Sequence, residues 1–168
     1  MRPLSRRPSR PGIRVNPPRV ALGSDLRSDL TDALDRSLHE RGFVVERIGA
    51  LAPGAGDAWQ SVGREVGEAV SSGRCTWGIV CCWTGTGVCI AANKVPGARA
   101  ALCADAATAQ GARIWNDANI LALSIRATSV AIAEELLTAW LAAEPTTDPR
   151  YRAMIDDLVA GDRIPTRG

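Results

Sequence analysis

Short apolar runs alternate with helix-forming segments along most of this chain, and this alternation constrains the fold more than any other feature. The runs read RVALGS, FVVERI, WGIVCC, ARAALC and NILAL, at residues 19–24, 43–48, 77–82, 98–103 and 119–123. Runs that are apolar almost throughout are typical of strands buried on both faces of a parallel sheet. The sequence therefore predicts an α/β fold in which helices cover both faces of a parallel sheet.

The helix-forming segments carry apolar residues at helical spacing and end at recognisable stop signals. Gly42 stops the first segment, Gly73 stops the second, and Ser129 is a predicted N-cap. The expected helices span 30–41, 59–72, 87–94, 105–114, 129–142 and 150–159. A Pro/Thr/Asp linker precedes the last of them.

The ends of the chain differ in composition from its body. The formal net charge is +2, but residues 1–18 hold five arginines and five prolines. An Arg- and Pro-rich segment without aromatic residues predicts a disordered extension and no nucleic-acid partner. We expect a folded domain over 19–160 and a flexible tail at 161–168. No stretch approaches the roughly 20 apolar residues of a membrane span, so no membrane partner is expected.

The chain has five cysteines and one histidine. The number of cysteines is odd, no pair has C-x-x-C spacing and no secretory signal is recognisable, so reduced thiols in the cytoplasm are expected. His39 stands beside Glu40 and Arg41 on a charged helix face, which predicts a solvated surface residue. Neither a metal site nor a cofactor is expected.

Polar residues gather where the predicted strands end. Asp25 follows the first strand, Cys82 ends the third, and Arg126 follows the fifth. In open parallel sheets, ligands bind at the carboxyl ends of the strands. The sequence therefore places a carboxylate, a thiol, a glycine turn and a cation at one edge of the sheet.

The segment Cys82-Trp83-Thr84-Gly85-Thr86-Gly87 carries the strongest chemical signal. Its glycines allow a tight turn that exposes amide N–H groups at a helix start, where an anion or a developing oxyanion is stabilised. A thiol beside such a turn is well placed for proton transfer. A plain strand-to-helix turn with a buried structural cysteine is the alternative.

Other residues near the strand ends have structural interpretations as well. Cys81 points to the opposite face of its strand from Cys82 and belongs to the core. Asp25 is either a helix cap or a functional carboxylate. The pair Asn116-Asp117 forms a turn by default.

Several segments together resemble the ribose-5-phosphate isomerase B / galactose-6-phosphate isomerase family. They are ALGSDL, DAWQSVGREVGEAV, GIVCCWTGTGVCIAANKVPGARAALC and WNDANILALSIR, at 21–26, 57–70, 78–103 and 115–126. The resemblance implies a flavodoxin-like, three-layer α/β/α domain with a five-stranded parallel sheet. It also implies a homo-oligomer, dimer or tetramer, with active sites shared between subunits and the last helix packed on a neighbour.

The resemblance also implies roles for individual residues. The family interconverts aldose and ketose phosphates without a metal, through an enediolate. Cys82 matches the base in members that use a cysteine. The amides around Thr84 to Gly87 match the groups that stabilise the enediolate. Asp25 matches an acidic residue near the sugar oxygens, and Asn116 matches an asparagine that contacts the enediolate region. Arg126 matches an arginine of the phosphate site.

The departures from the family pattern concentrate in the pocket. Trp115 stands where the family has its ring-opening histidine, Trp83 replaces a glycine, and Trp59 lies in a segment that usually reads Asp-Tyr-Pro. Arg150 is kept at the last helix, but Met154 takes the place of a second arginine. Loss of imidazoles and of a cation weakens a phosphate site, whereas indole rings favour apolar faces.

We therefore expect an isomerase that keeps the proton-transfer chemistry. Cys82, Asp25 and Thr84 would be its catalytic groups, and its substrate would be an unphosphorylated, open-chain or otherwise unusual sugar. The residues expected to bind that substrate are Trp59, Trp83, Gly85, Thr86, Gly87, Trp115, Asn116, Arg126 and Arg150. Two alternatives stay open: an ordinary pentose- or hexose-phosphate isomerase, and a non-catalytic subunit or small-molecule-binding homologue.

Overall fold

The structure is a computed structural model that describes residues 17–162. Most of the Arg/Pro-rich extension and of the predicted tail, at 1–16 and 163–168, lies outside the described residues. Within these residues there are five strands: β1 (Arg19–Ser24), β2 (Val44–Gly49), β3 (Trp77–Cys82), β4 (Ala100–Leu102) and β5 (Ile120–Ser124). The same part of the chain has six helices: α1 (Asp29–Glu40), α2 (Trp59–Ser71), α3 (Thr86–Ala92), α4 (Ala106–Asn116), α5 (Val130–Ala142) and α6 (Pro149–Gly161).

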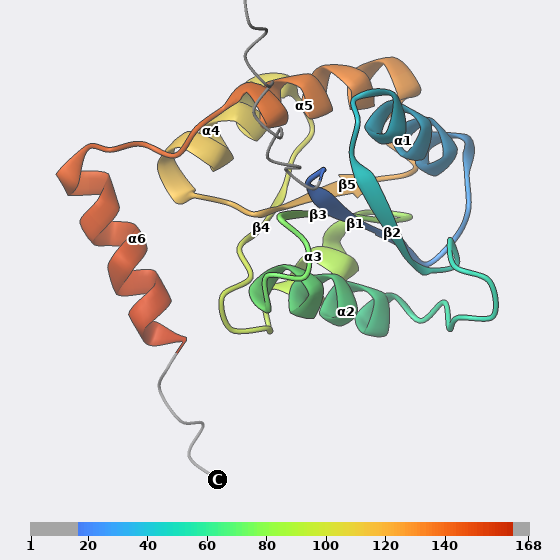
Figure 1. Ribbon diagram of the computed structural model, residues 1–168, viewed down its shortest axis with the longest axis horizontal. Helices are drawn as coiled ribbons and strands as arrows, with labels where there is room; N and C mark the ends of the chain where they lie inside the picture. The colour runs from blue at the N-terminus through green and yellow to red at the C-terminus, as the bar shows by residue number, and fades with distance from the viewer. Residues whose placement is uncertain (1–16, 163–168) are drawn as a thin grey trace, which may run out of the picture.

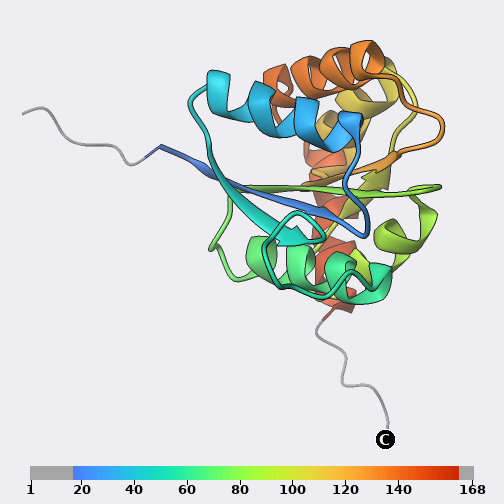
Figure 2. The same cartoon turned by 90° about the vertical axis from the view of Figure 1, so that its right-hand side faces the viewer.

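The strands form one parallel sheet in the order β2-β1-β3-β5-β4. Helices α1, α4 and α5 cover one face, and α2 and α3 cover the other (Figures 1 and 2). This confirms the predicted three-layer arrangement with a five-stranded parallel sheet. Because all strands run the same way, their carboxyl ends meet at a single edge.

Side-chain caps fix where several helices begin. Ser28 caps α1 by accepting the N–H of Thr31, so Asp25 is not the cap of this helix. Ser129 caps α5, as predicted, by accepting the N–H of Ile132. Asp105 caps α4 in the same way. Each cap satisfies an N–H that the first turn of a helix leaves without an internal partner.

Several elements differ by one or two residues from the bounds expected from sequence, and the differences at β4 and α4 matter most for the site. Strand β4 has three residues instead of the predicted six, because only Ala100–Leu102 pairs with β5. Helix α4 continues to Asn116, two residues past its predicted end, and stops at Asp117, whose backbone is left-handed with φ 47°. Asn116 is therefore the last residue of a helix, and only Asp117 belongs to the turn.

The two faces of the sheet have separate cores. Cys81 is fully buried in the core under α1, α4 and α5, whereas Cys82 belongs to the core under α2 and α3. The predicted division of these neighbours between opposite faces is confirmed. Trp140 of α5 is the largest of the fully buried side chains.

Helices α2 and α3 pack with their backbones in contact. A Cβ atom added to Gly63 of α2 would lie 2.6 Å from the carbonyl oxygen of Val88 and 2.7 Å from Cβ of Ala91. At Gly67, one turn further on, an added Cβ would lie 2.9 Å from the Val95 side chain. Gly63 leaves no space for a larger residue between the helices, and Gly67 makes room for Val95, which follows α3.

Helix α6 projects from the body of the molecule (Figure 1). Ile155 is its one buried residue, while Met154 and Leu158 are exposed. Packing of this helix on a neighbouring subunit stays a prediction. None of the helices in residues 17–162 combines the length and the apolar character that a membrane crossing needs.

Candidate active site

A hollow of about 350 Å³ lies at the carboxyl edge of the sheet. Its lining comes from the ends of β1 and β3 and from the starts of α2 and α3. The lining residues are Asp25, Trp59, Cys82, Trp83, Thr84, Thr86 and Gly87. Seven of the residues expected from sequence to serve the site therefore meet in one place, as the rule for parallel sheets requires.

Gly85 gives the turn after β3 its shape. Its backbone is left-handed, with φ 75° and ψ −16°, which glycine adopts without strain. A Cβ atom there would lie 2.6 Å from Cδ1 of Leu102 and 2.8 Å from the backbone carbonyl of Leu123. The turn thus packs directly against the end of β5. Glycine is required here both by conformation and by space.

Cys82 is held at the base of this turn. The Gly85 N–H donates to the Cys82 Sγ at 3.1 Å, and also to the Cys82 carbonyl oxygen at 3.2 Å. The thiol is 5% exposed, so it borders the hollow from a nearly dry environment. An N–H donor is a stronger partner for a negatively charged sulfur than for a neutral one. The position suits a thiol that takes up and returns a proton.

Amide groups of the following helix are free to bind an anion. Hydrogen bonding within α3 begins with the N–H of Cys89, which donates to the Gly85 carbonyl at 3.2 Å. The amides of Thr86 and Gly87 precede it and have no partner inside the helix. Both residues line the hollow. The Thr84 and Thr86 hydroxyls hydrogen-bond to each other at 2.8 Å and stiffen the turn.

Asp25 supplies the carboxylate of the hollow. Its Oδ1 is buried and has no hydrogen-bond partner. Burial raises the pKa of this carboxyl above its usual value, and the nearby charge of Asp57 raises it further, against a backbone hydrogen bond that lowers it. The sequence pattern gave no sign of this influence of Asp57. A carboxyl with an unused oxygen and a raised pKa can exchange protons with a ligand.

Two indole rings form the walls of the hollow. Trp59 begins α2 and lies over Gly87, where an added Cβ would be 2.9 Å from its Cε3. Trp59 is 47% exposed and Trp83 is 57% exposed. Exposed indoles beside a polar turn offer flat surfaces for the C–H faces of a small ligand. No lysine, arginine or histidine lines this hollow among the residues that the structure describes.

Arg126 lies in an adjoining hollow. This second space, of about 440 Å³, is lined by Thr84, Ser124 and Arg126 together with mainly small or apolar residues. The Arg126 N–H donates to the Trp83 carbonyl at 3.1 Å, and the Ser124 hydroxyl donates to the same oxygen at 3.0 Å. Arg126 thus reaches the same edge as Cys82, across Thr84.

The remaining predicted residues do not join them within one chain. Trp115 and Asn116 end α4, which returns to the opposite edge of the sheet before β5 begins. In β5, Ser124 pairs with Cys82 and Ile120 pairs with Gly78. Four residue steps of about 3.3 Å put at least roughly 13 Å between the two edges.

A hollow at this opposite edge, of about 190 Å³, is lined by Trp115, Asn116 and four residues of α6: Tyr151, Met154, Ile155 and Leu158. Arg150 is an exposed residue at the start of the same helix. The predicted site residues thus form two separate groups in a single chain.

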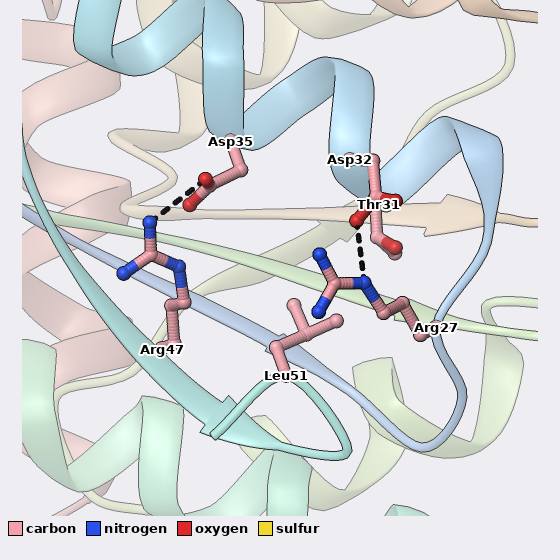
Figure 3. A pocket seen from close by; sticks show the side chains of 6 residues that line it. All are labelled: Arg27, Thr31, Asp32, Asp35, Arg47 and Leu51. Atoms are coloured by element: carbon pink, nitrogen blue, oxygen red, sulfur yellow. Dashed lines mark hydrogen bonds and ion pairs between the residues drawn. The ribbon is translucent and has the colours of Figure 1, made fainter. Parts of the chain in front are cut away.

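A fourth, small hollow is lined by two ion pairs together with Thr31 and Leu51 (Figure 3). The Arg47 guanidinium meets Asp35 at 2.9 Å and Arg27 meets Asp32 at 2.8 Å, around a space of about 20 Å³. That space holds little more than one water molecule. His39, the one histidine, is exposed nearby and contacts the Asp35 carbonyl at 2.7 Å, as expected for a surface residue.

Comparison with known proteins identifies the family. The family model described as Ribose/Galactose Isomerase matches residues 20–158. This chain belongs to the ribose/galactose isomerase family. It is 36% identical over 126 residues to D-erythrulose-4-phosphate isomerase of Pectobacterium atrosepticum, covering 74% of this chain and 83% of that protein. It is 37% identical over 107 residues to ribose-5-phosphate isomerase B of Escherichia coli, covering 64% and 71%.

Solved structures of the family have the same fold. Ribose-5-phosphate isomerase B of Clostridium thermocellum superimposes with a TM-score of 0.79 at 36% identity, over 86% of this chain and 97% of that one. The type B enzyme of Trypanosoma cruzi gives 0.80 at 33% identity, over 88% and 97%. The resemblance stated from the sequence is confirmed, as is membership in a family of aldose–ketose isomerases.

Proposed function

We propose that this member of the family is a metal-independent aldose–ketose isomerase in which Cys82 moves the proton. The observation that carries the proposal is the Gly85 N–H donated to the Cys82 Sγ at 3.1 Å, beside a hollow that also holds an unpartnered oxygen of Asp25. A thiolate base and hydrogen-bond donors for an oxyanion are sufficient for this chemistry.

Each group has a defined task in the reaction. The Cys82 thiolate removes the proton from C2 of the aldose, which forms an enediolate and a thiol, and the thiol then returns the proton to C1. The amides of Thr86 and Gly87 stabilise the negative oxygen of the intermediate. Asp25 carries the proton that must pass from the oxygen on C2 to the oxygen on C1. Trp59 and Trp83 hold the carbon chain between them.

The substrate enters in its open-chain form. Ring opening needs an acid–base group at the ring oxygen, and the one histidine lies on the surface of α1, away from the hollow. Trp115 stands where the family resemblance expects an imidazole. A sugar that cannot close a ring needs no such group.

The charge of the hollow argues against a dianion beside Cys82. Among the described residues that line it, Asp25 is the one charged residue, and each absent charge-assisted contact weakens phosphate binding by about 1.5–3 kcal/mol. We therefore favour an unphosphorylated open-chain sugar as substrate. Arg126 and Arg150 are the cations available to a longer, anionic one.

A second candidate is a four-carbon sugar phosphate. The relative from Pectobacterium atrosepticum is named for D-erythrulose 4-phosphate. In a tetrose 4-phosphate the oxygen that would close a five-membered ring carries the phosphate, so the sugar stays open. This candidate accounts for the missing ring-opening imidazole and assigns the phosphate to Arg126.

We also propose that the active chain is a homo-oligomer. Asn116 and Arg150 lie at the opposite edge of the sheet from Cys82, so they reach a Cys82 hollow only if it belongs to a second copy. A two-fold axis would bring each group of one chain to the complementary group of the other.

Proton NMR in D2O tests the proposal. Erythrulose, its 4-phosphate, ribose 5-phosphate and unphosphorylated pentoses are offered to the protein, and deuterium entry at C1 or C2 is followed. We expect exchange with at least one open-chain substrate and a loss of about 1000-fold or more in Cys82→Ala. The matched control is Cys75→Ala, because Cys75 is a buried thiol near Glu46 and away from the hollow.

The outcomes separate the candidates. Exchange only with unphosphorylated sugars supports the favoured substrate, and exchange with erythrulose 4-phosphate supports the second candidate. Normal turnover of ribose 5-phosphate would show an ordinary isomerase that opens rings by other means. Full exchange in Cys82→Ala would refute the assigned base, and binding without exchange would indicate a non-catalytic homologue.

A further inference from the structure

The corner between α4 and β5 has an unusual backbone. Among residues 17–162, Asp117 is the one non-glycine residue with positive φ, at 47°. L-residues avoid this region because Cβ approaches the neighbouring carbonyl, and they stay there only when their surroundings hold them. The residue just before this corner is Asn116, the last residue of α4.

The Arg99 side chain binds both the backbone carbonyl and the carboxylate of Asp117. The Arg99 Nε donates to the Asp117 carbonyl oxygen at 2.7 Å, and Nη2 donates to the Asp117 carboxylate at 3.1 Å. Two further guanidinium groups approach the same carboxylate, Arg113 at 3.8 Å and Arg152 at 3.6 Å. One carboxylate therefore has three cations around it, one from the same helix and one from α6.

Arg99 is itself tied to the edge of the sheet. Its backbone N–H donates to the Asn119 Oδ1 at 2.7 Å, and its side-chain Nη1 donates to the Gly97 carbonyl at 3.3 Å. The Asn119 Nδ2 also donates to the Gly97 carbonyl, at 2.9 Å. Asn119 thus uses both ends of its amide to hold the corner. The hydrogen bonds that hold Asp117 therefore continue through Arg99 to Asn119, just before β5.

The side chain of Asn116, unlike that of Asn119, is not held by hydrogen bonds within residues 17–162. It lines two hollows, of about 410 and about 190 Å³, that both border α6, and no hydrogen bond ties its amide to another described residue. The Asp117 carboxylate and the guanidinium groups around it thus fix the corner, while the amide of Asn116 remains available to a ligand. A fixed backbone with a free side chain is what a binding group needs.

We propose that Asp117, held by its hydrogen bonds to Arg99, is a positioning residue that sets the direction in which Asn116 meets the substrate. The proposal rests on the proposed function, in which Asn116 reaches the site of a second copy, and on the family resemblance, which implies that it contacts the enediolate there. Asp117 does not touch the substrate. It acts by fixing the last turn of α4, and it also offsets part of the positive charge of three guanidinium groups.

Kinetics of Asp117→Asn separate positioning from charge. This variant keeps a side chain that tolerates positive φ but loses the carboxylate. We expect kcat to fall about 10- to 100-fold with KM changed less than about threefold, because a misplaced contact is lost mainly in the transition state. If the charge of Asp117 mattered most, the extra positive charge would change KM and leave kcat unaltered, and that result would overturn the proposal.

Three further variants complete the kinetic test. Asp117→Gly adopts the left-handed backbone without strain and covers the case in which Asp117→Asn folds poorly. Arg99→Lys keeps the charge but cannot bind carbonyl and carboxylate together, so its kcat should stay low. The matched control is Asp156→Asn, which removes an equal charge from the exposed partner of Arg152 on α6 and should keep the wild-type kcat.

A measurement that needs no turnover distinguishes failure of the positioning role from failure of the proposed function. Fluorotryptophan labelling gives Trp115, next to Asn116, its own 19F NMR signal, assigned with Trp115→Phe. We expect that signal to shift or broaden in Asp117→Asn and to stay in place in Asp156→Asn. A wild type that turns over no sugar, combined with this shift, would refute the proposed function and retain the fixed corner. An unchanged signal with unchanged kcat would refute the positioning role.

Discussion

Substitution of Gly85 by alanine should damage both the stability and the activity of the protein. The left-handed backbone at φ 75° costs an L-residue about 1–2 kcal/mol. The added methyl group would also lie 2.8 Å from the carbonyl of Leu123, which belongs to the backbone of β5 and cannot rotate away. Overpacking of this kind costs about 1–3 kcal/mol. Together these terms lower the free energy of unfolding by about 2–5 kcal/mol.

The matched control is Gly54→Ala. Gly54 has nearly the same backbone, φ 72°, but an added Cβ there would meet no atom within 4 Å. Its substitution should therefore cost only the conformational term of about 1–2 kcal/mol. Urea unfolding of both variants, at one protein concentration because the chain is proposed to associate, gives the difference between them.

The activity of the two variants should differ more than their stability. In Gly85→Ala the N–H that donates to Cys82 moves with the turn, and we expect kcat to fall about 100-fold. Gly54→Ala should keep wild-type turnover. If Gly85→Ala were no less stable than Gly54→Ala and fully active, the steric reasoning about this turn would be refuted.

Two further predictions concern titrating groups. Burial raises the pKa of Asp25, so this carboxyl contributes stability below its ordinary pKa of about 3.8 that is lost as the pH rises through the folded-state pKa. Asp25→Asn should therefore raise the melting temperature at pH 7 and lose this advantage near pH 3; a constant difference across that range would contradict it. Burial also raises the pKa of Cys81 to about 12 and of Cys103 to about 11, so iodoacetamide at pH 8 should leave both thiols unmodified in the folded protein, as mass spectrometry would show.

The fold could be predicted because its strands are apolar nearly throughout. The bounds expected for β1 and β3 agree with the structure, since both strands are buried on two faces over nearly their whole length. Strand β4 was predicted too long because an edge strand pairs on one side only, and apolar sequence does not reveal where pairing ends. The end of α4 was missed because Asp117 takes a conformation that sequence rules assign to glycine.

The candidate site could be predicted in part for a related reason. Asp25, Cys82 and the glycine turn meet because parallel strands end at one edge, which a sequence can indicate. The influence of Asp57 on Asp25 could not be predicted, since it depends on how the loop after β2 folds back. The ion pair between Arg99 and Asp117 joins residues 18 positions apart, so no local sequence pattern predicts it. The roles of the site residues stay predictions until variants are assayed.

The backbone contact between α2 and α3 has a consequence for how this pocket can diversify. Gly63 leaves no space between the two helices, so Trp59 at the start of α2 and the turn at the start of α3 belong to one rigid block. A new specificity cannot arise by sliding one helix against the other. It must arise by exchanging exposed side chains on an unchanged frame, one position at a time. Trp59 and Trp83 are both at such positions, where substitution during evolution can change the substrate with little effect on the stability of the fold.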